Sequence, residues 1–118
     1  RNEAGLQALD EAQVSIDARG ERWWEAEIQR LRGELLLSQS GTNAGDAEAC
    51  FERALHISRN QEAKSLELRA AMSLARSWQA QGKADQARDL LAPVYAWFTE
   101  GFGTADLKRA KALLDRLG

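Results

Sequence analysis

Few residues in this 118-residue chain could carry out chemistry. Cys50 is the only cysteine and His56 the only histidine, and both are expected on one helix. A separation of six residues on a helix turns the two side chains about 240° apart, so they cannot form a thiol–imidazole pair. We therefore predict that Cys50 is either a small packing residue or an exposed thiol, and that the chain contains no catalytic residue.

Metal and nucleotide chemistry have equally little support. A protein zinc site needs clustered His, Cys and carboxylate ligands, which one histidine and one cysteine do not supply. The segment Gly101-Phe102-Gly103 resembles part of a nucleotide-binding loop, but it follows no predicted strand and no Gly-Lys-Ser/Thr occurs. We predict a helix–helix turn there, and no metal or cofactor.

The charges are interleaved along the chain. Lysine and arginine number 16 against 18 aspartate and glutamate, for a net charge of −2. Nucleic-acid binding requires a concentrated basic face, so this balance does not favour it. Carboxylates alternate with basic residues in the manner of a solvated helix face. Two such runs are Glu48, Glu52, Arg53 and Glu62, Lys64, Glu67.

The composition indicates a globular helical chain. Charged residues make up 29% and hydrophobic residues 44%, with a single proline. No run approaches the roughly 18 apolar residues of a membrane span, and no signal peptide is recognisable. A lone cysteine excludes an internal disulfide and fits a cytoplasmic location. Because the chain begins with Arg1 and not with methionine, we expect it to be part of a longer protein.

The stretch from residue 64 to residue 98 has a pattern around which the chain is organised. Apolar residues recur with helical spacing on either side of a short turn at residues 81–83, which predicts two antiparallel helices. The length and the small–large spacing match a tetratricopeptide (TPR) unit of about 34 residues. The two series are Leu68, Ala71, Ala75, Trp78 and Ala87, Leu91, Val94, Phe98.

The same spacing occurs earlier in the chain. Ala47, Phe51 and Ala54 correspond to Ala87, Leu91 and Val94, and Gly33 corresponds to Ala75. Gly5, Leu9 and Ala12 match Ala47, Phe51 and Ala54, which gives the second half of a further repeat. We predict an all-α, TPR-like right-handed superhelix of antiparallel helix pairs in one domain, 1–118; the alternative is an ordinary up-down helical bundle. Its parts are a half repeat at 2–19, full repeats at 21–59 and 61–99, and a C-terminal capping helix at 105–117.

Local signals refine the individual helices, which we expect at 21–39, 45–59, 61–81 and 84–99 within the two repeats. Pro93 should kink the last of these without ending it, because apolar residues continue beyond it. Thr104 is a suitable N-cap for the capping helix. The core stripe of helix 21–39 is predicted to be Trp24, Ile28, Leu31 and Leu35.

Several segments together resemble the C-terminal TPR tail of large bacterial signalling proteins. Such proteins carry a class III adenylate or guanylate cyclase, or a DNA-binding transcriptional activator domain, ahead of a predicted ATPase module. The resemblance implies a non-catalytic, regulatory, protein-binding tail, with the cyclase as first choice for the parent and the transcriptional regulator as second. The segments are 21–27 (ERWWEAE), 30–37 (RLRGELLL), 47–55 (AEACFERAL), 64–71 (KSLELRAA), 90–102 (LLAPVYAWFTEGF) and 103–107 (GTADL).

In TPR stacks the first helix of each pair lines a concave groove, so the resemblance also implies a binding surface. Its mixed charge would suit a polar peptide or another domain of the parent protein. A nucleotide or other small molecule bound between helices is the alternative, and exposed apolar residues of helix 2–19 predict a homodimer. The groove residues are Glu27, Arg30, Glu34, Arg69, Met72, Arg76 and Gln79.

Overall fold

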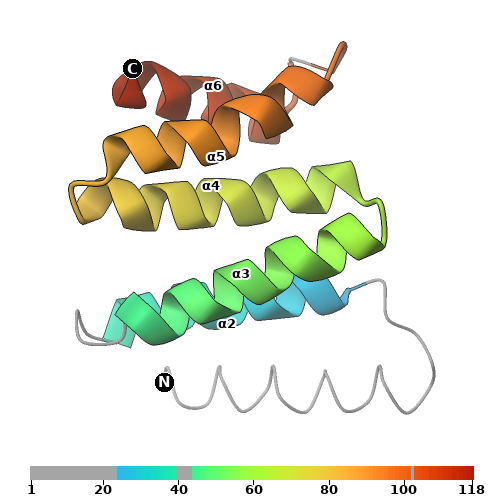
Figure 1. Ribbon diagram of the computed structural model, residues 1–118. Helices are drawn as coiled ribbons and strands as arrows, with labels where there is room; N and C mark the ends of the chain where they lie inside the picture. Colours follow the sequence, from blue (N-terminus) through green and yellow to red (C-terminus); the bar gives the residue numbers. More distant parts are fainter. Residues whose placement is uncertain (1–23, 40–43, 102) are drawn as a thin grey trace.

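The computed structural model describes residues 24–39, 44–101 and 103–118, and within these residues it is all α-helical (Figure 1). Consecutive helices run antiparallel and pack as sequential pairs, which confirms the all-α prediction. The predicted half repeat at 2–19, its dimer surface and Trp23 lie outside the described residues. The helices are α2 (Glu25–Gln39), α3 (Ala44–Asn60), α4 (Lys64–Ala80), α5 (Ala84–Trp97) and α6 (Ala105–Leu117).

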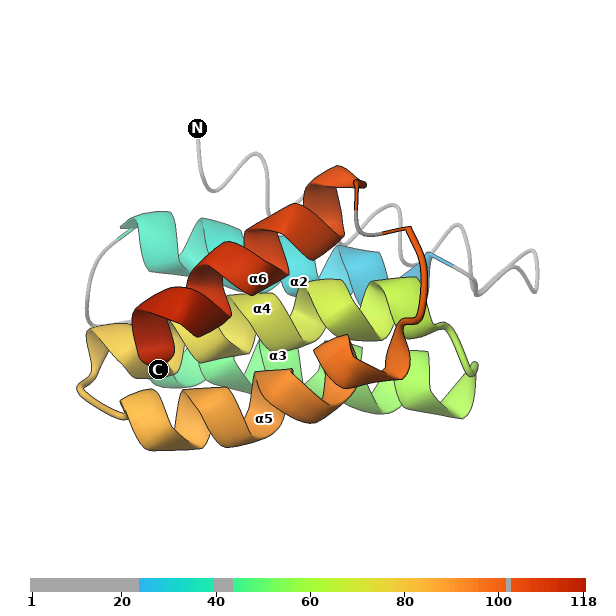
Figure 2. The same cartoon turned by 90° about the horizontal axis from the view of Figure 1, so that it is seen from above.

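The helices have two kinds of neighbour. Each helix packs against the next in sequence, and α4 also packs against both α2 and α6. In contrast, the backbones of α3 and α5 do not come close to each other along their described lengths. Figure 2 shows the result: α2 and α6 lie on one side, α3 and α5 on the other, and α4 runs between them. The helices α2, α4 and α6 therefore share one face of the molecule.

The turns after α3 and α4 share one geometry. After α3, the Ala63 N–H donates to the Ser58 carbonyl at 2.9 Å, and Glu62 has a positive φ of 55°. After α4, Gly82 has the corresponding φ of 80°. This hydrogen bond closes a Schellman motif, which ends a helix. Residues 61–63 therefore belong to a turn, and α4 begins three residues later than predicted.

The ends of α5 and α6 follow from local chemistry. The helix α5 continues through Pro93 to Trp97, and it stops two residues before the predicted end because Phe98 is extended (φ −77°, ψ 135°). Thr104 accepts a hydrogen bond from the Leu107 N–H on its Oγ1 at 3.4 Å. This bond confirms the predicted N-cap of α6.

The small residues of the predicted repeats lie buried at contacts between helices. Ala75 and Ala87 are completely buried. A Cβ atom on Gly33 would lie 2.5 Å from Cε1 of Phe51, which is itself fully buried. The α2–α3 contact therefore depends on a residue without a side chain beside a large ring.

The predicted core stripe of α2 is confirmed at Ile28 and wrong at Trp24 and Leu31. Ile28 is buried, but Trp24 and Leu31 are 42% and 41% exposed. Of the residues that α2 buries, only Ile28 belongs to the predicted stripe; the others are Ala26, Glu27, Gln29 and Gly33. The physical reason is that α2 packs against α3 and α4 together, which places a polar part of its surface in contact with its neighbours.

Candidate functional site

Most of the predicted groove residues lie along the contact between α2 and α4. Nη1 of Arg69 lies 3.1 Å from Oε2 of Glu27. About two turns further along both helices, Nη2 of Arg76 lies 3.2 Å from Oε2 of Glu34. Two ion pairs thus link helices whose sequences are about forty residues apart.

Glu27 is at the centre of this arrangement. Its side chain is 10% exposed, and Arg30 binds both carboxylate oxygens, each at 2.9 Å. Burial alone would raise the pKa of Glu27, but the hydrogen bonds and positive charges of Arg30 and Arg69 outweigh burial and lower it. The hydrogen bond from Arg30 to Glu27 raises the pKa of the arginine in turn. Glu27 is thus held as a carboxylate shared by two guanidinium groups.

The structure adds Asp106 of α6, which the sequence analysis did not include. Nε of Arg69 donates to Oδ2 of Asp106 at 2.7 Å, and this hydrogen bond raises the pKa of Arg69. Nη1 of Arg109 lies 3.7 Å from the other oxygen of Asp106. Arg69 therefore bridges carboxylates from α2 and α6. The only sequence signal was an acidic residue in the first turn of a helix, which is also explained by the helix dipole.

Ser73 is a second residue that the sequence analysis missed. It is 1% exposed, and its hydroxyl donates to Oε2 of Glu34 at 2.7 Å. The same hydroxyl oxygen accepts from Nη1 of Arg30 at 3.4 Å. Ser73 therefore connects the two ion pairs, and its buried hydroxyl is satisfied on both sides.

These contacts surround a hollow of about 150 Å³, which we call the cationic hollow. Four of the seven predicted groove residues line it, Glu27 and Glu34 bind its arginines, and Gln79 is not part of it. Of the five charged residues that line it, four are arginines and one is an aspartate. The lining residues are Arg30, Arg69, Met72, Arg76, Asp106 and Arg109.

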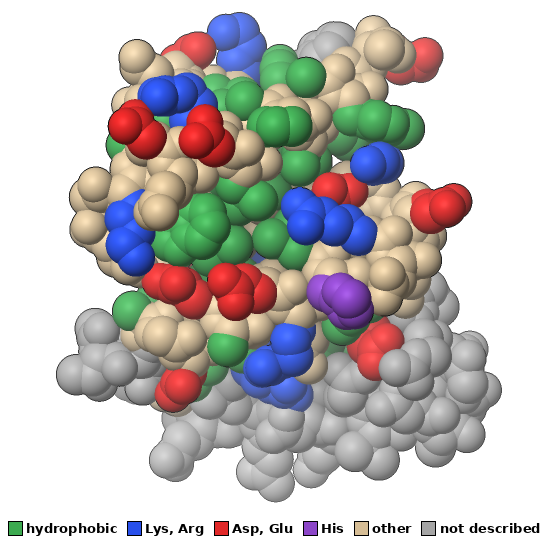
Figure 3. Space-filling model, in the orientation of Figure 1, with side chains coloured by type: hydrophobic (Ala, Val, Ile, Leu, Met, Phe, Trp, Pro, Cys, Tyr) green, Lys and Arg blue, Asp and Glu red, His purple; other side chains and the backbone are tan. Residues whose placement is uncertain are grey.

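The opposite face, formed by α3 and α5, has no comparable gathering of one charge: basic, acidic and hydrophobic side chains mix across its described part (Figure 3).

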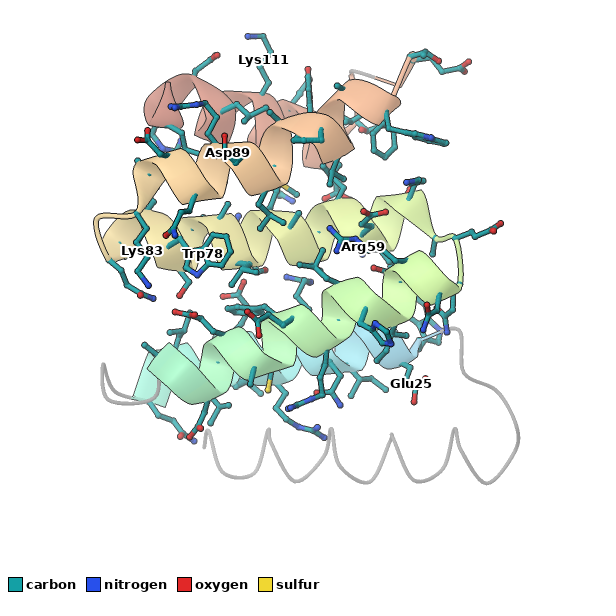
Figure 4. All side chains as sticks on the ribbon, in the orientation of Figure 1. Glu25, Arg59, Trp78, Lys83, Asp89 and Lys111 are labelled. Carbon is teal, nitrogen blue, oxygen red and sulfur yellow. The ribbon has the colours of Figure 1, made fainter. Side chains whose placement is uncertain are left out.

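Two of the carboxylates that were predicted to lie on a solvated helix face contact other side chains. Glu67 is 5% exposed and pairs with Arg59 at 3.0 Å and Lys64 at 3.3 Å. Glu48 accepts a hydrogen bond from Nε1 of Trp78 at 3.3 Å. Each carboxylate therefore contacts a side chain of the neighbouring helix. These two side chains, Arg59 and Trp78, are labelled in Figure 4.

Cys50 and His56, the two residues considered for catalysis, have different partners. Cys50 is buried and lies 3.3 Å from Nη2 of Arg53, so it is a packing residue and not an exposed thiol. Nε2 of His56 lies 3.1 Å from Nδ2 of Asn60. Across the described ranges, no group of three or more His, Cys, Asp or Glu is placed to hold a metal ion. Of the helices described, none has the length and apolar character that crossing a bilayer requires.

The lowered pKa of Glu27 predicts a specific pH dependence of stability. Because the folded pKa lies below the unfolded value of 4.5, its contribution is fully present above pH 4.5 and is lost as the pH falls through the folded pKa. Denaturant unfolding of the wild type and Glu27→Gln should therefore differ at neutral pH and converge below pH 4.5. A difference that stays constant down to acidic pH would contradict this assignment.

The fold and site define a class only: an all-α domain of antiparallel helix pairs with a polar, arginine-rich face. No protein family, curated protein or solved structure matches the chain in comparisons with known proteins.

Proposed function

We propose that this chain is a TPR-like helical-repeat domain, wound as a right-handed superhelix, that binds a polypeptide on the face formed by α2, α4 and α6. The observation that carries the proposal is the cationic hollow. Residues predicted from two separate repeats converge there, and α6 completes the lining. A binding face with this many interlocked side chains is pre-organised, which lowers the entropy cost of association.

The helix contacts support the repeat assignment. In a stack of helix pairs each unit contacts only its neighbours, and a terminal element covers the last open edge. Here the first helices of successive pairs, α2 and α4, touch, and α6 packs against both helices of the preceding pair. These are the contacts expected of two repeats followed by a cap.

The proposed setting rests on the resemblance described above. The domain would be a cytoplasmic, non-catalytic regulatory tail of a bacterial signalling protein, with a cyclase as the first choice of output domain and a transcriptional regulator as the second. Its partner would be another domain of that protein or a peptide. The homodimer through helix 2–19 remains a prediction, because that helix lies outside the described residues.

Peptide selection tests the proposal. The 118-residue chain is immobilised and used to select short peptides from a random phage-displayed library, and each selected peptide is measured by fluorescence anisotropy. Arg76→Glu combined with Arg109→Glu should weaken binding at least tenfold, because both residues line the cationic hollow.

The matched control is Lys83→Glu combined with Lys111→Glu, which makes the same change in net charge. Both lysines are exposed, and Figure 4 shows Lys111 pointing away from the other helices. Equal losses in the two double variants would refute the proposed face. Absence of any selected peptide, together with a rise in melting temperature on adding ATP or GTP, would favour the small-molecule alternative.

A further inference from the structure

Arg69 binds residues of two helices that lie apart from each other. The backbones of α2 and α6 do not come close along their described lengths, and α4 lies between them (Figure 1). From α4, Nε of Arg69 donates to Oδ2 of Asp106 at 2.7 Å, and Nη1 donates to Oε2 of Glu27 at 3.1 Å. The two bonds use different nitrogens of one planar guanidinium, so both form at the same time. Arg69 therefore links a carboxylate of α2 to a carboxylate of α6.

The helix α6 is the terminal element of the stack. Within the described chain it packs against α4 and α5 along one apolar row, formed by Leu107, Ala110, Leu113 and Leu117. Arg69 binds its first turn through Asp106, and Nη1 of Arg88 donates to the Leu117 carbonyl at its end, at 2.9 Å. The connection from α5 includes Gly101, which has a positive φ of 81°. A terminal helix with few neighbours opens locally at a lower free energy than the core, so a polar contact at its start can decide how often it opens.

Glu27 holds Arg69 where Asp106 can bind it. An arginine side chain loses much rotamer freedom when it is fixed in one position. With Glu27 in place that loss has already occurred when α6 docks. Repulsion between the two carboxylates opposes this effect, but Arg30 offsets the charge of Glu27 by binding both of its oxygens at 2.9 Å. The contact between Glu27 and Arg69 therefore strengthens the docking of α6.

We propose that Arg69 is a relay that couples the docking of α6 to the contact between α2 and α4. Displacing Glu27 from Arg69 loosens α6, and by thermodynamic reciprocity displacing α6 weakens the contact between Glu27 and Arg69 by the same factor. The helix α6 is in this sense a releasable cap, whose opening exposes its apolar row and the surface of α4 and α5 beneath it. The coupling is a property of the chain alone and does not depend on whether a peptide binds.

Native-state hydrogen exchange of the 118-residue chain, followed residue by residue by NMR at neutral pH, tests the relay. Amides of α6 that exchange by local opening are recognised because low concentrations of denaturant change their rates less than those of α3. Glu27→Gln should raise these α6 rates at least about threefold. Because local opening does not pass through global unfolding, a variant that only lowers the overall stability would leave the rates unchanged.

Glu34→Gln is the matched control. Glu34 lies on the same helix and pairs with Arg76 of α4 at 3.2 Å, as Glu27 pairs with Arg69. In the described part of the chain, the hydrogen bonds and ion pairs of Arg76 reach Glu34 and Ser73 but no residue of α6. Glu34→Gln should therefore change the local-opening rates of α6 by less than about half as much as Glu27→Gln does.

Removing the relay gives the decisive comparison. In Arg69→Gln, Glu27 keeps Arg30 as its partner, and adding Glu27→Gln should leave the α6 rates unchanged. An effect of Glu27→Gln that persists without Arg69, or that Glu34→Gln equals, would overturn the relay. Amides of α6 that all respond to denaturant as strongly as those of α3 would overturn the releasable cap, because α6 would then open only when the whole domain unfolds.

Discussion

Replacing Phe51 with alanine is expected to lower the free energy of unfolding by roughly 3–5 kcal/mol. The ring is completely buried between α3 and its neighbours, and it lies against the backbone of α2 at Gly33. Truncation removes the buried ring and leaves a cavity that the close α2–α3 contact cannot collapse to fill. Chemical denaturation followed by circular dichroism measures the loss. Glu52→Ala, on the exposed side of the same helix, is the control and should change stability by less than about 0.5 kcal/mol.

Gly33, which faces the Phe51 ring, gives an independent check on the α2–α3 contact. The second helix pair uses Ala75 and Leu91 where the first uses Gly33 and Phe51, and all but Gly33 are completely buried. Gly33→Ala alone should destabilise, because its Cβ would overlap the Phe51 ring. Combined with Phe51→Leu it should cost less than the sum of the two single changes, by about 0.5–3 kcal/mol. Strict additivity would mean that the two residues do not meet as described.

Glu27→Lys should be comparably damaging, with an expected loss of roughly 3–5 kcal/mol in the free energy of unfolding. The change removes the carboxylate shared by Arg30 and Arg69 and adds a third positive charge beside them. Because Glu27 is buried, water cannot screen the resulting repulsion. The same denaturation measurement applies.

Two variants make the Glu27 result interpretable. Glu52→Lys makes the same charge change on an exposed position and should be nearly silent. Glu27→Gln keeps the shape of the side chain and removes only the charge, so its loss should be smaller than that of Glu27→Lys. If Glu27→Lys and Glu52→Lys were equally well tolerated, the network would contribute nothing to the fold.

Local pattern accounts for much of the fold. The all-α character, the antiparallel pairing and the cap at Thr104 depend on spacing and turn chemistry within a few residues, and all three were predictable. Errors at helix ends arose where backbone geometry competes with pattern. Residues 61–63 have helical composition, yet the positive φ of Glu62 places them in a turn.

The candidate site, too, could be predicted from the sequence only in part. The resemblance to TPR stacks implied a groove lined by the first helix of each pair, so Arg30, Arg69 and Arg76 could be named in advance. It could not show that Asp106 joins them, because that depends on how α6 packs against α4.

The sequence by itself determined the helices, their pairing and the small residues at their contacts, because these follow from interactions between residues close together in the chain. Only the tertiary structure decided which face α2 buries, which arginine each carboxylate binds, and that Asp106 of α6 lines the cationic hollow. The physical reason is that helix packing orientation and side-chain reach are set by contacts among several helices at once, and residue spacing in one helix does not encode them.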